Sequence, residues 1–72
     1  MEQKLREALS YNLRVERAKL NISREKLAEM ADFSTKHLTD IESMKVMPSI
    51  FIVYKLAKAL GVTLDYLVNK ND

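Results

Sequence analysis

The sequence predicts an all-α fold, a compact five-helix bundle in a single domain, and three observations support this. The 72 residues include one glycine and one proline, a composition that favours helices with short connections. Apolar residues recur at three- and four-residue intervals, the spacing of one helix face. Residues that favour helix ends stand at the boundaries of these periodic stretches. We expect a domain over 1–72, with its core at 5–68 and a frayed polar tail at 69–72.

The first predicted helix occupies about the first twenty residues. Its apolar stripe comprises Leu5, Ala8, Leu9, Leu13 and Leu20. The Asn21-Ile22 step ends it, and Ser23 can accept a hydrogen bond from a free backbone amide at the start of the second helix. In the second helix we expect three residues to face inward, Leu27, Ala28 and Met30.

Asp32 marks a sharp turn between the second and third predicted helices. Aspartate is one of the few residues that tolerate a left-handed backbone conformation. Phe33 can then enter the core, and Ser34 caps a third helix that ends near Ser43. Two capped helices joined by a tight turn form a helix-turn-helix, a unit that can present its second helix to the major groove of DNA.

Two further helices complete the predicted bundle. Pro48-Ser49 opens the fourth, whose periodic residues are Ile50, Val53, Leu56, Ala57 and Leu60. Gly61 ends it. Thr63 caps a short fifth helix, in which Leu64 and Leu67 close the core.

A charged residue falls on the inner side of each of two predicted helices. On the third helix, Glu42 shares a face with Leu38 and Ile41. On the first, Arg17 lies between Leu13 and Leu20. One unpartnered buried ion costs several kcal/mol, so we predict a salt bridge between Arg17 and Glu42; the alternative is that both side chains bend to solvent.

The outer side of the third helix is polar. In a major groove Lys36 could donate to guanine, the hydroxyl and methyl groups of Thr35 and Thr39 could contact bases, and Asp40 could accept from cytosine. The alternative is an ordinary solvated helix face. The capped helix-turn-helix favours the first interpretation.

Composition excludes several classes of protein. No cysteine is present, and the single histidine, His37, cannot form a metal cluster, so we expect no metal or other cofactor. No apolar run is long enough to span a membrane or to form a signal core, so we expect a cytoplasmic protein without membrane contact. The net charge of +2 permits nucleic-acid binding but does not indicate it. An enzyme is disfavoured because no pocket, metal cluster or nucleophile accompanies His37.

From about Leu9 to Val68 the chain resembles the Cro and phage-repressor class of helix-turn-helix regulators, the XRE family. The matching pieces are Arg17, Ile22-Ser23, Glu25-Lys26-Leu27-Ala28, Phe33-Ser34, Leu38, Ile41-Glu42, Pro48-Ser49 and the run from Leu56 to Asp65. The resemblance implies a recognition helix at 34–43 with base contacts from Thr35, Lys36, Thr39 and Asp40. It also implies phosphate contacts near the helix starts and the following loop, at Ser23, Arg24, Ser34 and Lys45. Free amides at helix N-termini agree with this.

Some residues depart from the family pattern. Asp32 and the Ser43-Met44 pair stand where many relatives have glycine, and Arg24 replaces a frequent glutamine. A left-handed residue other than glycine costs about 1 kcal/mol, so the loop at Met44 is expected to change path and to affect the contact of Lys45.

An apolar cluster follows the recognition helix: Met44, Val46, Met47, Phe51 and Ile52. It predicts either a dimer or partner surface, or an enlarged core beneath the loop. The final helix offers a competing dimer surface at Tyr66, Leu67 and Val68. Our leading hypothesis is a repressor that binds a two-fold DNA operator as a homodimer, with no small-molecule ligand. The alternative is a helix-turn-helix adaptor that binds a protein through the 44–52 cluster and binds DNA weakly or not at all.

Overall fold

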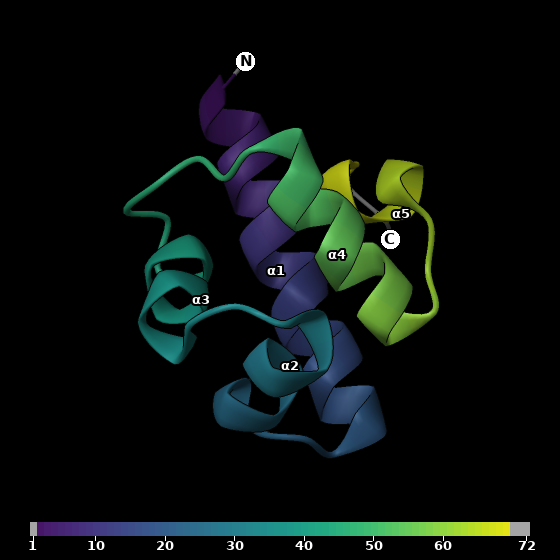
Figure 1. The fold of residues 1–72 in the computed structure, drawn as a ribbon. Helices are drawn as coiled ribbons and strands as arrows, with labels where there is room; N and C mark the ends of the chain where they lie inside the picture. The colour runs from purple at the N-terminus through teal and green to yellow at the C-terminus, as the bar shows by residue number, and fades with distance from the viewer. Residues whose placement is uncertain (1, 70–72) are drawn as a thin grey trace.

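The structure is a computed structural model that describes residues 2–69. Within this range it contains five helices and no strand (Figure 1): α1 (Glu2–Leu20), α2 (Arg24–Ala31), α3 (Thr35–Glu42), α4 (Ile50–Leu60) and α5 (Leu64–Val68). The predicted all-α, five-helix fold is confirmed. None of the helices in the described range is long and apolar enough to cross a membrane.

Serine and threonine hydroxyls define where four helices begin. Ser23, Ser34, Ser49 and Thr63 each accept a hydrogen bond from the backbone amide three residues later, at 3.0 to 3.2 Å. Each such cap stabilises its helix by about 1 kcal/mol. Gly61 ends α4 with φ +73°, in the left-handed region where glycine carries no steric penalty.

The core lies where α1 packs against α3 and α5, and where α2 packs against α3 and α4. Figure 1 shows α4 crossing in front of α1, with the loop from α3 reaching the start of α4. The largest fully buried apolar side chains come from all five helices: Leu9, Leu13, Leu27, Leu38, Ile41, Leu56 and Leu67. The helices are therefore fixed relative to one another by one shared core.

Three residues expected on inner faces are exposed. The buried residues of α2 are Leu27, Ala28 and Ala31, which leaves Met30 on the flank of the helix. Ile50 follows the spacing of the α4 stripe but is 69% exposed, because side chains in a first turn tilt beyond the helix start. Leu20 is exposed because the last turn of α1 extends past the core.

Asn69, where the polar tail was expected to begin, forms hydrogen bonds to residues of α1 and α5. The side-chain nitrogen Nδ2 of Asn69 donates to the backbone carbonyl oxygen of Asp65 at 2.8 Å and to the Asp65 carboxylate at 2.9 Å. Its own carbonyl oxygen accepts from Asn12 Nδ2. The rest of the expected tail, 70–72, lies outside the described residues.

Candidate nucleic-acid interface

The connection from α2 to α3 is a tight left-handed turn. Asp32 has φ +61°, and the amide of Phe33 donates to the carbonyl oxygen of Ala28 at 3.0 Å. Phe33 is half-buried against the core, and its ring meets His37 edge-on, with ring centroids 5.6 Å apart. The turn thus fixes the direction in which α3 leaves α2.

The two sides of α3 differ sharply in burial. Leu38, Ile41 and Glu42 are buried. The four residues expected to contact bases lie at the surface, with Lys36 exposed and Thr35, Thr39 and Asp40 partly exposed. Lys36 Nζ and Asp40 Oδ2 are 3.2 Å apart. Because Asp40 is paired with a lysine of the same face, its charge is offset where it would otherwise repel phosphates.

Glu42 lies at the centre of an ion-pair network that fixes α3. Its carboxylate, only 1% exposed, accepts from Arg17 Nε and Nη2, both at 2.9 Å, and from Arg24 Nε at 3.0 Å. The hydrogen bond to Glu42 is the main cause of a raised pKa at Arg17. Ser10 also donates its hydroxyl to the Glu42 carbonyl oxygen. One carboxylate therefore ties the end of α3 to both α1 and the start of α2.

From the sequence, Arg17 was the only predicted partner of Glu42, and Arg24 was expected to contact a DNA phosphate. Arg24 is 46% exposed on its side chain, and within residues 2–69 only its Nε is hydrogen-bonded. The network joins two guanidinium groups to one carboxylate, and Glu25 in the first turn of α2 adds a second negative charge near Arg17. No local signal in the sequence indicated that Arg24 would reach Glu42. Arg17 also donates from Nη1 to the carbonyl oxygen of Ile22 at 3.1 Å.

The other residues expected near phosphates lie at helix starts and in the loop after α3. The hydroxyls of Ser23 and Ser34 accept the capping hydrogen bonds described above. Lys45 is exposed, and its amide donates to the carbonyl oxygen of Asp40 at 2.9 Å. Met44 adopts φ +65°, a left-handed conformation. The loop was expected to change path because Met44 is not glycine, but it keeps the left-handed turn.

The apolar cluster after α3 divides into two parts. Met44, Met47 and Phe51 are exposed, whereas Val46 and Ile52 are partly buried against the core. The cluster therefore contributes both to the surface and to the core beneath the loop. Ile50 and Tyr54, which were not predicted, extend its exposed part along α4.

The final helix offers less surface than expected. Leu67 is 0% exposed, so its place in a dimer surface is wrong: it closes the core instead. Tyr66 and Val68 are partly buried, and the Tyr66 hydroxyl donates to Glu16 Oε2 at 2.6 Å. This hydrogen bond is the main cause of a pKa of Glu16 below its ordinary 4.5 and of a pKa of Tyr66 above its ordinary 10.0.

A capped helix, a left-handed turn and a second helix with a buried and an exposed polar side define a helix-turn-helix domain. The family model described as "Helix-turn-helix" matches residues 13–67, and the chain belongs to this family, the XRE class. A solved structure from Neisseria, described as a hypothetical transcription factor NHTF, is similar with a TM-score of 0.90 and 30% identity over 97% of this chain and 79% of that one. No curated protein is significantly similar in sequence.

Proposed function

We propose that this helix-turn-helix protein is a sequence-specific transcriptional regulator that represses by occupying a two-fold operator through its recognition helix, 34–43. The observation that carries the proposal is the anchoring of α3. Its inner side is fixed by Leu38, Ile41 and the Glu42 network, while its polar side faces outward. A rigid helix with an exposed polar side suits the major groove. The family and the similar transcription factor support DNA binding.

Base recognition would come from four side chains of α3. Lys36 would donate to guanine acceptors and Asp40 would accept from a cytosine amino group, while Thr35 and Thr39 would contact neighbouring bases. The Lys36–Asp40 ion pair is exposed, and such pairs contribute about 0.5 kcal/mol, so DNA can separate it at little cost.

Phosphate contacts would come from the starts of α2 and α3 and from the loop. Ser23 and Ser34 cap α2 and α3, so they lie at the positive ends of these helix dipoles. The terminal nitrogens of Arg24 would donate to a phosphate, while its Nε donates to Glu42. Lys45 is exposed beside the end of α3 and would reach the backbone from the other side.

A two-fold operator requires two copies of α3 about 34 Å apart, one turn of the duplex. The exposed part of the apolar cluster, Met44, Met47 and Phe51, is our proposed homodimer surface. Partly buried Val46 and Ile52 would support it from beneath, and Tyr66 and Val68 at α5 would form the alternative surface. Occupation of the operator by the dimer would block polymerase.

Selection of bound duplexes from a random pool tests this function and identifies the operator. Against the selected site, Lys36→Ala should weaken specific binding more than non-specific binding, and Arg24→Ala should weaken both. Lys4→Ala, an exposed lysine on α1, is the matched control and should change neither appreciably. Absence of binding to any duplex at low salt would overturn the proposal.

An adaptor function is the second candidate, favoured by the 60% exposure of Phe51 beside exposed Ile50. Soluble proteins seldom leave such apolar surface uncovered. Phe51→Asp separates the two functions. If it abolishes association with a protein while DNA binding stays intact or is absent from the start, the adaptor is supported. If it prevents dimers and weakens operator binding, the regulator is supported.

A further inference from the structure

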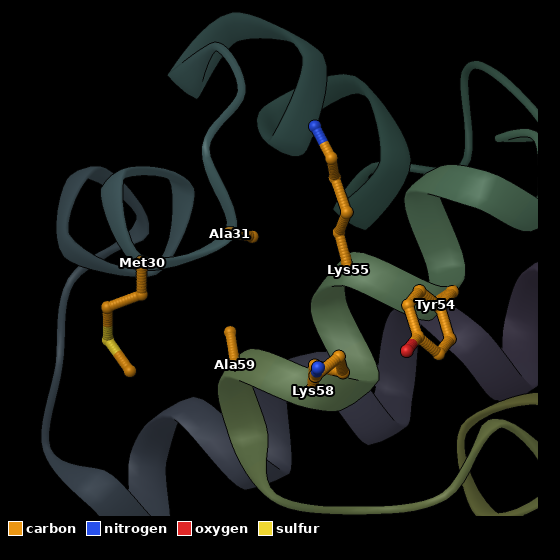
Figure 2. Close-up of a pocket in the computed structure, with 6 residues that line it drawn as sticks. All are labelled: Met30, Ala31, Tyr54, Lys55, Lys58 and Ala59. Carbon is orange, nitrogen blue, oxygen red and sulfur yellow. The ribbon is translucent and has the colours of Figure 1, made fainter.

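An open groove lies between α2 and α4 (Figure 2), and none of its residues is among those assigned above to bases or phosphates. Tyr54, which extends the exposed apolar cluster along α4, belongs to both surfaces. The groove has a volume of about 300 Å³, and it is lined by Met30, Ala31, Tyr54, Lys55, Lys58 and Ala59. Met30 is 43% exposed at one side, and Tyr54 is exposed at the other. The groove thus combines apolar surface with two ammonium groups.

The charge of the groove is one-sided. α4 carries Lys55 and Lys58 but no acidic residue. Lys55 Nζ lies 4.8 Å from the centroid of the Phe51 ring and donates to the carbonyl oxygen of Asp32, while Lys58 Nζ lies 5.7 Å from the centroid of the Tyr54 ring. Rings and a carbonyl oxygen orient these ammonium groups without neutralising them.

Neither lysine forms an ion pair with any carboxylate in the described part of the chain. The cationic side chains that do form ion pairs there are Arg6, Arg17, Lys19, Arg24, Lys26 and Lys36. The groove therefore keeps positive charge beside an uncovered apolar surface. A carboxylate of another molecule would form ion pairs with these two lysines.

We propose that this groove binds a segment of a partner protein in which carboxylates alternate with apolar side chains. The carboxylates pair with Lys55 and Lys58, and the apolar side chains cover Met30 and Tyr54. Charge complementarity selects an acidic partner. The apolar half favours a protein segment over DNA, because phosphates provide nothing that would cover Met30 or Tyr54.

Nuclear magnetic resonance titration of the full chain with a short synthetic peptide of alternating glutamate and leucine tests this inference. The matched peptide has glutamine in place of glutamate. Amide signals around Met30, Ala31 and the second half of α4 should shift with the glutamate peptide and less with the glutamine peptide. Lys58→Glu should weaken binding about fivefold or more, whereas Lys4→Glu, which makes the same change in net charge, should not.

Further variants separate the groove from the other surfaces. Met30→Ser removes exposed apolar area with little effect on folding, and it should weaken the binding of both peptides. Absence of shifts, or shifts centred on α3, would overturn the inference. So would a greater loss of DNA affinity in Lys58→Glu than in Lys4→Glu, which would assign the groove to phosphates. Loss of self-association in Lys58→Glu would assign it to a second copy.

Discussion

Asn12 Nδ2 lies 2.8 Å from the carbonyl oxygen of Asn69, so the middle of the first helix holds the end of the last. The same nitrogen donates to the carbonyl oxygens of Tyr66 and Leu67, both at 3.0 Å. The last carbonyls of a helix have no partner within it, and a buried side chain supplies one here. Asn12 therefore attaches α5 to α1, together with the hydrogen bond from Tyr66 to Glu16.

Asn12→Ala should lower the free energy of unfolding by about 1–3 kcal/mol, because it leaves buried carbonyl oxygens unpaired. Amide hydrogen exchange should accelerate first in α5, before the rest of the bundle. Asn69→Ala is the control, since it removes an exposed side chain that bonds with Asp65 but keeps the backbone carbonyl oxygen that accepts from Asn12. Equal loss of protection in all helices would contradict this role.

Glu42→Gln should lower the free energy of unfolding by about 3 kcal/mol, because it removes the shared charge of a buried network. Urea denaturation measures this loss. Arg24→Gln should cost only about 0.5 kcal/mol, since Arg24 is half-exposed and Arg17 still neutralises Glu42. If the two variants are equally destabilised, Arg24 is as important to the bundle as Glu42.

The hydrogen bond between Tyr66 and Glu16 should make stability depend on pH at both extremes. The pKa of Glu16 is lowered on folding, so the unfolded chain binds more protons, and this contribution is present above pH 4.5 and lost as pH falls through the folded pKa. The pKa of Tyr66 is raised, so its contribution is present below pH 10.0 and lost as pH rises through the folded pKa.

Tyr66→Phe should weaken both dependences, because it removes the donor. Urea denaturation across the pH range, compared between the variant and the original chain, provides the measurement. Tyr54→Phe, at an exposed tyrosine of α4 that does not contribute to the pKa shift of Glu16 or Tyr66, is the control and should preserve both slopes. Unchanged slopes in Tyr66→Phe would show that other groups control the pH dependence.

Met44→Gly should raise the free energy of unfolding by about 0.5 to 1 kcal/mol, because Met44 has φ +65° and glycine removes the steric cost. Gly61→Ala should have the opposite effect and lower the free energy of unfolding. Nothing lies within 4 Å of the added Cβ, yet φ +73° makes alanine unfavourable by about 1 kcal/mol. Thermal unfolding of the pair measures both effects, and a destabilised Met44→Gly would show that the methionine side chain matters more than its backbone strain.

Local sequence signals were sufficient for the order of the helices and for most of their ends. Caps at Ser23, Ser34, Ser49 and Thr63 depend on residues close in the chain, and the turn at Asp32 depends on its own backbone preference. Helical spacing also placed Arg17 and Glu42 on inner faces. These features require no knowledge of the tertiary packing.

Features that depend on distant segments could not be read in this way. The two hydrogens of Asn12 Nδ2 are shared among three carbonyl oxygens more than fifty residues away, and no local pattern distinguishes this asparagine from a surface one. Met30 looks like a core residue by type, but the position of the neighbouring helices decides its burial. The second guanidinium on Glu42 was missed for the same reason.

The Glu42 network has a consequence for engineering. Because α3 is anchored through its buried residues Leu38, Ile41 and Glu42, we expect the orientation of the helix not to depend on which residues stand at 35, 36, 39 and 40. Those positions can be exchanged as a set without loosening the scaffold. Variants in which these four residues are replaced together should therefore keep the fold, so that any change in what they bind would be due to the exposed side of α3.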